Sequence, residues 1–452
     1  MQDRLFGTNG VRGVVNEDMN VQFAMDLGRS IGEFMSGEVA IATDTRTSGQ
    51  MLKSAVSCGL MASGADVIDL GIIPTPALQY FVKSNPVSGG VMITASHNPP
   101  EFNGIKCIDA DGTEMPRSRE ERIESIYFSR NFSHRDWKEI GSHLPPENAI
   151  EPYAAAIRSL VDLKAIRKAD MSVVLDCANG AGSLFAPDFL DSLGVRAVTL
   201  NCNPQGTFPG HPSEPTPDHL SDLISLVRET DTDMGIAQDG DADRAIFVDE
   251  KGTYLFGDKS LSILARFAVR EKRGIVVTPI SSSSCVEDVV REEGGEILYT
   301  RVGSPVVARK MIEVDAVFGG EENGGLIFPE HQYCRDAAMT VAKMLEIVAK
   351  HGPLSELVKD VPVYHLDKRK VSCPNDRKQG VLEAVVSQQK EMRVDTTDGV
   401  KVYFDDGWTL IRPSGTEPIV RIYSEGRTED SASNRGERYE RLVIDLLSDR
   451  SG

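Results

Sequence analysis

Two short stretches of the chain hold side chains that could do chemistry. In TASHNP an apolar run ends at Ser96 and His97, and in DGDADR the carboxylates Asp239, Asp241 and Asp243 alternate with small residues. A serine hydroxyl at a loop tip could act as a nucleophile, with the neighbouring histidine accepting or orienting its proton. Ser, Asn and Pro are also common turn residues, so a plain turn is the alternative for TASHNP.

The three aspartates are typical of a divalent-cation site. Alternating carboxylates in an extended or looped backbone can converge on one side, and hard oxygen ligands of this kind suit Mg²⁺. Arg244 follows directly and offers a charged fork for phosphate oxygens. Asp-Gly pairs also form solvated turns, but three carboxylates between the strand-like flanks GIAQ and AIFVD would repel one another without a cation. We therefore predict a metal site at Asp239, Asp241 and Asp243.

The sequence RPSGTEP is a candidate anion-binding loop. Ser414, Gly415 and Thr416 offer backbone N–H groups and hydroxyls, and Arg412 and Arg421 supply positive charge. The chain as a whole has a net charge of −19, so any phosphorylated ligand needs such a local positive patch.

Three further groups could complete the site. GEENGG follows a strand-like segment, and its Glu321 and Asn323 could bind sugar hydroxyls, although a hairpin turn is an equal alternative. Arg12 lies in the glycine-rich stretch FGTNGVRG. Lys106 lies ten residues after Ser96 and could return to it.

Strands and helices alternate through most of the chain and must position these groups. We expect strands at 38–44, 65–71 and 89–96 with helices between them, and two further blocks with the same alternation. Each strand ends in small polar residues, which is typical of α/β layers with loops at the carboxyl ends of strands. In the tail, VKVYFDDGWTLIRPS and TEPIVRIYSEG predict an antiparallel pair, followed by a helix over 432–447.

The predicted fold class is α/β, with three related α/β domains and a small carboxyl-terminal α+β domain. The domain boundaries that we predict are 1–148, 149–250, 251–362 and 363–452.

Composition narrows the function classes. Apolar residues make up 40% of the 452-residue chain, enough for several globular cores. The net charge of −19 repels nucleic acid and anionic lipid, so we expect neither as a partner. The seven cysteines are scattered without a C-x-x-C pair, which argues against disulfides or a zinc ribbon. No signal-peptide core or membrane-length apolar run is present, so the sequence predicts a cytoplasmic protein.

Taken together and in this order, the Ser96 loop, the triple-aspartate loop, GEENGG and RPSGTEP resemble the motifs of the α-D-phosphohexomutases. With Arg12 and Arg421 at the two ends, the resemblance covers essentially the whole chain. The opening LFGTNGVRG and the loop GEENGG are similar to the archaeal-type phosphoglucosamine mutase and phosphomannomutase branch of that family.

The resemblance implies four domains around a central cleft and a phosphoryl group on Ser96. It implies Mg²⁺ held by the three aspartates and phospho-Ser96, and a hexose 1,6-bisphosphate as activator. Proton transfer would fall to Lys106 or His97, and the sequence leaves that choice open. The implied catalytic residues are Ser96, Lys106, His97, Arg12 and Arg244, and the implied substrate-binding residues are Glu321, Asn323, Arg412, Ser414, Gly415, Thr416 and Arg421.

The implied reaction moves a phosphoryl group between the 6- and 1-positions of a hexose phosphate, with a small sugar phosphate as the only partner required. Branch resemblance favours glucosamine phosphate, with mannose or glucose phosphate as alternatives. Other members of the family read GEMSGH or GEQSGH, whereas Asn323 and Gly325 replace the serine and histidine here, so sugar identity does not carry over from them. A sugar-phosphate phosphatase or a silent sugar-phosphate binding protein would not need both Ser96 and the aspartates. The sequence leaves open whether the chain forms a homodimer.

Overall fold

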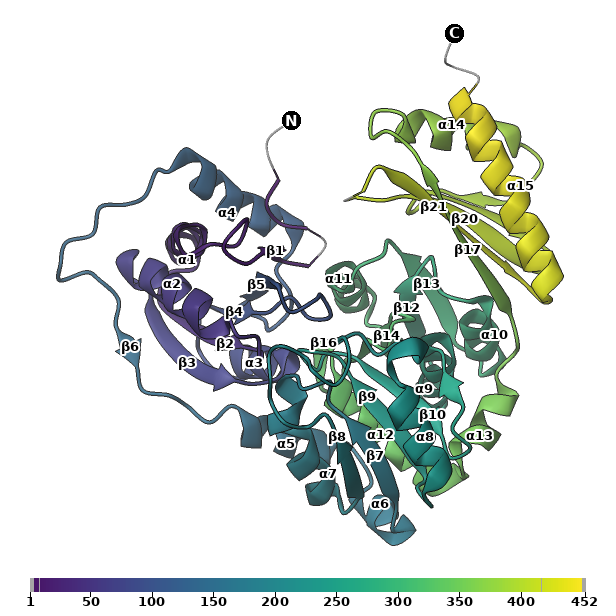
Figure 1. Cartoon of the computed structure of the whole chain (residues 1–452), viewed down its shortest axis with the longest axis horizontal. Helices are drawn as coiled ribbons and strands as arrows, with labels where there is room; N and C mark the ends of the chain where they lie inside the picture. Colours follow the sequence, from purple (N-terminus) through teal and green to yellow (C-terminus); the bar gives the residue numbers. More distant parts are fainter. Residues whose placement is uncertain (1–3, 8, 416, 449–452) are drawn as a thin grey trace.

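The chain folds around four β-sheets that follow one another along the sequence (Figure 1). The computed structural model describes residues 4–7, 9–415 and 417–448. Three sheets are mixed and flanked by helices, and the fourth is antiparallel throughout. The predicted fold class, three α/β units and a smaller α+β unit, is confirmed.

The first sheet carries the Ser96 loop. Its strands are β1 (Val11–Val14), β2 (Glu38–Thr43), β3 (Asp66–Ile72), β4 (Gly89–Ile93), β5 (Phe102–Asp109) and β6 (His143–Leu144), and its helices are α1 (Val21–Met35), α2 (Gly49–Ala62), α3 (Thr75–Ser84) and α4 (Arg117–Ser129). The strand order is β1-β5-β4-β2-β3-β6. Strand β4 is buried along its whole length, as expected for an apolar strand with helices on both faces. It runs parallel to β2 and antiparallel to β5.

The second sheet carries the triple-aspartate loop at the turn of a hairpin. Its strands are β7 (Ser172–Asp176), β8 (Arg196–Leu200), β9 (Met234–Gln238), β10 (Ala245–Asp249) and β11 (Tyr254–Leu255), and the helices nearby are α5 (Ile150–Ser159), α6 (Leu163–Ala169), η1 (Ala181–Leu184), α7 (Ala186–Leu193), η2 (Pro217–His219) and α8 (Ser221–Glu229). Strands β9 and β10 pair antiparallel on either side of the motif. Strand β11 pairs with β10 and so extends this sheet past residue 250. The domain boundaries remain predictions.

The third sheet carries GEENGG, also at a hairpin. Its strands are β12 (Ile275–Pro279), β13 (Glu296–Thr300), β14 (Phe318–Gly320), β15 (Leu326–Phe328) and β16 (Gln332–Arg335), and its helices are α9 (Gly257–Glu271), α10 (Ser284–Glu292), α11 (Ser304–Val314), α12 (Ala337–His351), α13 (Leu354–Leu357) and η3 (Val358–Asp360). Helix α12 packs against α5 and α6 of the second unit. One continuous apolar core therefore runs through the first three units, and it includes Ile68, Phe247 and Leu345.

The fourth sheet corrects one expectation from the sequence. Its strands are β17 (His365–Ser372), β18 (Val394–Asp395), β19 (Val400–Phe404), β20 (Gly407–Pro413) and β21 (Ile419–Gly426), and its helices are α14 (Lys378–Gln388) and α15 (Glu429–Ser448). VKVYFDDGWTLIRPS forms two strands and not one: β19 and β20 pair as a hairpin around Asp405 and Asp406, and β20 then pairs antiparallel with β21. RPSGTEP then lies between β20 and β21.

The fourth unit lies beside the third, and the chain enters it through β17 (Figure 1). It has its own apolar core, which includes Val402, Ile422 and Tyr439. A small cluster of Ile280 with Trp408 and Leu410 links it to the third unit. Within the described ranges, none of the helices has both the length and the apolar character needed to cross a bilayer.

Candidate active site

Ser96 lies just beyond β4, in a loop that faces the second sheet. The side chain is fully buried, and its Oγ donates a hydrogen bond to Asp239 Oδ2 at 2.8 Å. The backbone of Ser96 is left-handed, with φ at 53°. For a residue with a Cβ this conformation costs roughly 1–2 kcal/mol, so the surrounding loop must hold it in place.

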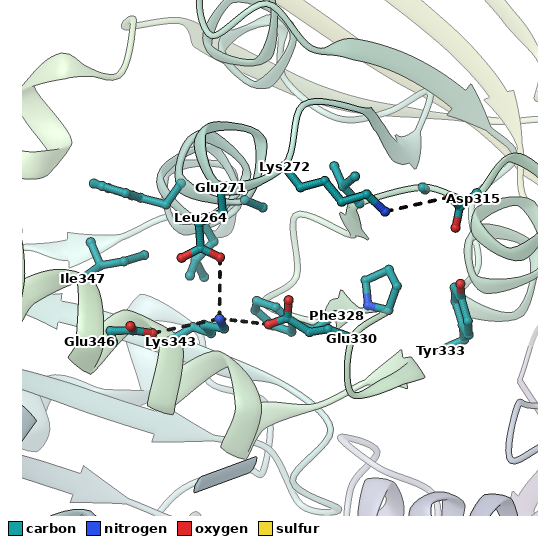
Figure 2. A pocket seen from close by; sticks show the side chains of 15 residues that line it. Leu264, Glu271, Lys272, Asp315, Phe328, Glu330, Tyr333, Lys343, Glu346 and Ile347 are labelled. Carbon is teal, nitrogen blue, oxygen red and sulfur yellow. Dashed lines mark ion pairs between the residues drawn. The ribbon is translucent and has the colours of Figure 1, made fainter. Parts of the chain in front are cut away.

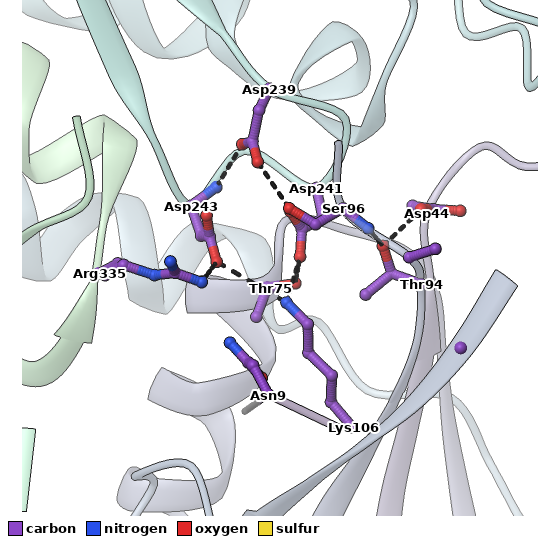
Figure 3. Close-up of polar contacts among 12 residues, drawn as sticks. Asn9, Asp44, Thr75, Thr94, Ser96, Lys106, Asp239, Asp241, Asp243 and Arg335 are labelled. Atoms are coloured by element: carbon purple, nitrogen blue, oxygen red, sulfur yellow. Dashed lines mark hydrogen bonds and ion pairs between the residues drawn. The ribbon is translucent and has the colours of Figure 1, made fainter. Parts of the chain in front are cut away.

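The three aspartates converge as the sequence predicts. One carboxylate oxygen from each lies within 4.8 Å of the others, and all three residues are buried. Figure 3 shows them directed toward Ser96 and Lys106. Oδ1 of Asp241 and Oδ1 of Asp243 are buried without a hydrogen-bond partner among the described residues. Asp243 Oδ1 lies 3.7 Å from Arg244 Nε, which is an ion pair but not a hydrogen bond. Buried carboxylate oxygens without hydrogen bonds are unfavourable, so this set of donors fits a divalent cation.

The ionisation of the cluster supports the same conclusion. Burial, with the charges of Asp243 and Asp241, raises the pKa of Asp239 well above its usual range. Burial acts in the same direction on Asp241, yet the ammonium of Lys106 and the hydroxyl of Thr75 keep the pKa of Asp241 below its usual range. A further positive charge beside Asp239 would oppose the effect of burial and of the two neighbouring carboxylates and would favour its ionised form.

The pairing of β5 with β4 places Lys106 next to the triad. It lies opposite Met92 in the antiparallel pair β4–β5, ahead of the Ser96 turn. Its Nζ donates to Asp241 Oδ2 at 2.7 Å and lies 3.7 Å from Asp243 Oδ2. The predicted return of Lys106 toward the serine loop therefore brings it onto the neighbouring carboxylates.

Two residues that the sequence analysis missed hold the triad in place. Thr75, at the start of α3, donates from Oγ1 to Asp241 Oδ2 at 2.7 Å. Arg335, at the end of β16, donates from Nη2 to Asp243 Oδ2 at 2.5 Å and from Nη1 to Glu321 Oε2 at 3.3 Å. Neither residue belongs to a recognisable motif, and only the docking of the first and third units onto the second brings them here.

A cavity of about 600 Å³ lies next to the serine loop. Its lining includes Arg12, His97 and Arg244. Arg12 Nη1 donates to Asn98 Oδ1 at 2.6 Å. His97 Nδ1 lies 3.5 Å from Ser96 Oγ, and burial, with the nearby arginines, lowers the pKa of His97 to about 2. Its imidazole is therefore neutral near pH 7. Arg244 lies 3.8 Å from Asp239, close enough for an ion pair.

GEENGG forms the hairpin turn that the sequence offers as one alternative, and its contact with sugar hydroxyls stays a prediction. It is the hairpin turn between β14 and β15, and Glu321 and Asn323 also line the cavity. Glu321 Oε1 accepts a hydrogen bond from the Gly303 N–H at 3.0 Å, and Asn323 Oδ1 accepts one from the Gly325 N–H at 3.0 Å. The loop is thus an ordered turn that presents its polar groups to the cavity.

Among the described residues of the RPSGTEP loop, Gly415 alone lines the cavity. Ser414 Oγ accepts a hydrogen bond from the Glu417 N–H at 3.1 Å. Both arginines are paired with carboxylates: Arg412 Nε donates to Asp398 Oδ2 at 2.6 Å, and Arg421 Nη2 to Glu417 Oε2 at 2.9 Å. Thr416 lies outside the described residues.

A separate cavity of about 260 Å³ lies between α9 and α12, away from the triad. Figure 2 shows that its charged side chains pair among themselves. Lys343 lies 2.9 Å from Glu330, and Lys272 lies 3.9 Å from Asp315. This cavity contributes no group to the serine and aspartate cluster.

Comparison with protein-family models covers most of the chain in four consecutive matches. They are "Phosphoglucomutase/phosphomannomutase, alpha/beta/alpha domain I" at 3–134, the corresponding domain II at 151–252, domain III at 256–364, and the "C-terminal domain" at 370–439.

Relatives and solved structures agree with these matches. The chain is 44% identical to "Phosphoglucomutase/phosphomannomutase" of Thermococcus kodakarensis, over 99% of each chain. It is 40% identical to "Probable phosphoglucosamine mutase" of Methanopyrus kandleri, over 97% of this chain and 98% of that one. A crystal structure of a phosphoglucomutase/phosphomannomutase family protein from Burkholderia thailandensis superposes with a TM-score of 0.89 at 27% identity, covering 98% of this chain and 97% of the other. The chain therefore belongs to the phosphoglucomutase/phosphomannomutase family and is an isomerase that moves a phosphoryl group between positions of a hexose phosphate.

Proposed function

We propose that Ser96 carries the phosphoryl group during this reaction. The observation that carries the proposal is the 2.8 Å hydrogen bond from Ser96 Oγ to Asp239, in a triad where Asp241 Oδ1 and Asp243 Oδ1 accept no hydrogen bond from the described residues. A phosphoryl group on Ser96 would stand beside the predicted cation site. Arg12 and Arg244, which line the adjoining cavity, would neutralise its oxygens.

Asp239, Asp241 and Asp243 would hold Mg²⁺, with a phosphate oxygen on Ser96 as a further ligand. Bound there, Mg²⁺ supplies charge neutralisation for the transferred phosphoryl oxygens. Lys106 would keep Asp241 ionised and oriented through its 2.7 Å contact. Arg335 would do the same for Asp243.

In the first half-reaction, the bond between Ser96 Oγ and phosphorus breaks while a bond from the sugar hydroxyl oxygen to phosphorus forms. The hydroxyl proton leaves, and Ser96 Oγ takes up a proton. The hexose bisphosphate then turns around and returns its other phosphoryl group to Ser96. We assign the proton transfer to Lys106, whose Nζ lies 2.7 Å from Asp241, because burial and the nearby arginines lower the pKa of His97 to about 2 and leave its imidazole too weak a base to hold the proton.

We infer that the sugar is glucosamine phosphate, interconverted between its 6- and 1-phosphates. The name of the Methanopyrus kandleri relative supports this inference. The name of the Thermococcus kodakarensis relative favours the second candidate, a broad phosphoglucomutase/phosphomannomutase. Glu321 and Asn323 would contact the sugar, and the RPSGTEP loop would hold the phosphate that does not react.

We further propose a cytoplasmic location. All seven cysteines lie among the described residues and none is in a disulfide, as expected in a reducing compartment.

The test is a side-by-side measurement of kcat/KM for glucosamine, mannose and glucose 6-phosphates, with Mg²⁺ and a trace of glucose 1,6-bisphosphate. A clear preference for glucosamine phosphate supports the first candidate, and comparable rates with the other sugars support the second. The Ser96→Ala variant is measured in parallel. Loss of its hydroxyl should remove nearly all turnover and the phosphoryl mass on the protein, and near-normal turnover by Ser96→Ala would refute the covalent mechanism.

A further inference from the structure

We propose that Arg46, with Asp44 and Thr94, is a positioning device that fixes the backbone of Ser96 for phosphoryl transfer. The proposal rests on the proposed function, because the group being positioned is the Ser96 hydroxyl. These three residues lie just beyond the carboxyl ends of β2 and β4, beneath the serine loop.

The guanidinium of Arg46 binds the serine loop through four backbone carbonyls. The residue is 2% exposed. Nη1 donates to Pro99 O at 2.6 Å and to Phe102 O at 2.8 Å. Nη2 donates to Ser96 O at 2.9 Å and to Asn98 O at 2.5 Å. Only a guanidinium has donors in a planar fork that can reach four acceptors at once, so lysine cannot reproduce this set of bonds.

Asp44 connects Arg46, through Thr94, to the backbone N–H of Ser96. Its Oδ2 accepts from Arg46 Nε at 3.2 Å and from Thr94 Oγ1 at 2.5 Å. Thr94 Oγ1 in turn accepts from the Ser96 N–H at 2.8 Å. Figure 3 shows Asp44, Thr94 and Ser96 in this row. Both peptide groups of Ser96 are therefore held, the N–H through Thr94 and the C=O through Arg46.

These bonds matter because the Ser96 backbone is left-handed. A serine released from them would relax toward the common negative-φ regions, and the Cβ and Oγ would turn away from Asp239. The position of the reacting oxygen depends on this orientation. Catalysis of phosphoryl transfer relies almost entirely on positioning the reacting groups and on stabilising their charge.

The same residues lie where the first unit meets the second. The ring of Phe208 lies 4.9 Å from the Arg46 guanidinium, and Ser213 Oγ donates to Ser96 O at 3.3 Å. At Gly206 a Cβ would come within 2.2 Å of Thr45 O, so the second unit's loop contacts the Arg46 segment directly. Arg46 is not part of the described lining of the 600 Å³ cavity, so it acts through the serine loop and not on the substrate.

The experiment compares Arg46→Lys with a matched control, Arg266→Met. Arg266, on α9, is also a buried arginine whose Nη2 donates to a backbone carbonyl, Asp360 O at 2.9 Å, but it lies outside the site. Three quantities are measured: kcat and KM for hexose 6-phosphate, the rate of Ser96 phosphorylation by glucose 1,6-bisphosphate from intact mass, and Tm.

For Arg46→Lys we expect kcat and the phosphorylation rate to fall on the order of 100-fold, because displacing a reacting atom by about 1 Å has that effect. KM should stay within about threefold, since the substrate is held by other groups. Arg266→Met should lower Tm while leaving kcat within about twofold. A purely structural Arg46 would instead lower Tm and leave kcat and the phosphorylation rate near the wild-type values, which overturns the proposal.

Thr94→Val serves as a second variant if Arg46→Lys does not fold. It removes only the hydroxyl that links Asp44 to the Ser96 N–H. We expect its phosphorylation rate to fall about tenfold, the effect of roughly one hydrogen bond, and an unchanged rate would overturn the proposal. Ser96→Ala distinguishes a failure of the proposed function from a failure of the positioning role. Turnover by Ser96→Ala would contradict the proposed function itself. An inactive Ser96→Ala together with normal activity of Arg46→Lys would contradict only the positioning role.

Discussion

The side chain of Arg335 connects the triple-aspartate loop to the GEENGG loop, and the stability of an Arg335 variant tests this connection. Its guanidinium is buried between Asp243, at 2.5 Å, and Glu321, at 3.3 Å. Arg335→Met removes the positive charge and leaves two buried carboxylates without it. Removing one partner of a buried ion pair costs about 3–5 kcal/mol, because the remaining charge is no longer compensated. We therefore expect the free energy of unfolding to fall by about that amount in urea titrations with EDTA.

Mg²⁺ should reduce this loss. The proposed cation would sit against the same Asp243 carboxylate, whose Oδ1 has no hydrogen-bond partner among the described residues. Ligand binding to the folded state adds about 2.7 kcal/mol at a concentration of 100 Kd. The variant should gain more from Mg²⁺ than the wild type does, because Arg335 no longer competes for the charge. We expect the difference between them to shrink by at least about 1 kcal/mol at saturating Mg²⁺.

Arg309→Met is the matched control. Arg309 also joins two units, pairing with Asp109 and Asp111, but 31% of its side chain is exposed. Exposed ion pairs contribute about 0–1 kcal/mol, so this variant should lose little stability and show no dependence on Mg²⁺. The reasoning is refuted if Arg335→Met loses less than about 1 kcal/mol, or if its deficit is the same with Mg²⁺ as with EDTA.

Three further outcomes are expected. Asp241→Asn should weaken Mg²⁺ activation at least about tenfold, since one charged ligand is lost, and an unchanged Mg²⁺ titration would contradict the ligand assignment. Arg421→Ala should raise KM roughly ten- to a hundredfold with kcat nearly unchanged, the effect of losing one charge-assisted phosphate contact, and steady-state kinetics with an unaltered KM would count against the distal role. Burial lowers the pKa of Lys401 from 10.5 to about 8, against the opposing effect of Glu425. The unfolded chain thus binds more protons between these values, and stability should rise with pH there. Relative to Lys401→Met, the wild type should gain about 3 kcal/mol in unfolding free energy from pH 8 to pH 10.5, and parallel pH profiles for the two proteins would show the assignment to be wrong.

Local sequence determined where each chemical motif lies. The buried strand β4 ends just before Ser96, and DGDADR and GEENGG form the turns of two hairpins. Strand periodicity and turn residues act over a few positions, so these features could be predicted without knowledge of the fold. The same local patterns did not predict that VKVYFDDGWTLIRPS divides into β19 and β20 at Asp405 and Asp406.

The assembled site depends on contacts between distant segments. Ser96 meets Asp239 across the junction of two sheets. Thr75 of the first unit and Arg335 of the third unit also contact the triad, although no motif marks either residue. Arg412 and Arg421, which the sequence predicts to supply positive charge for an anion, both pair with carboxylates of their own unit, and only the tertiary structure shows these pairs.

The sequence by itself thus determined the fold class, the family resemblance and the loops that carry the reactive side chains. Only the tertiary structure decided which of those side chains touch and which residues hold them. The physical reason is that strand register and the docking of one sheet on another set these distances. Arg46 illustrates the difference, since its single guanidinium reaches four carbonyls of the serine loop that are some fifty residues away along the chain.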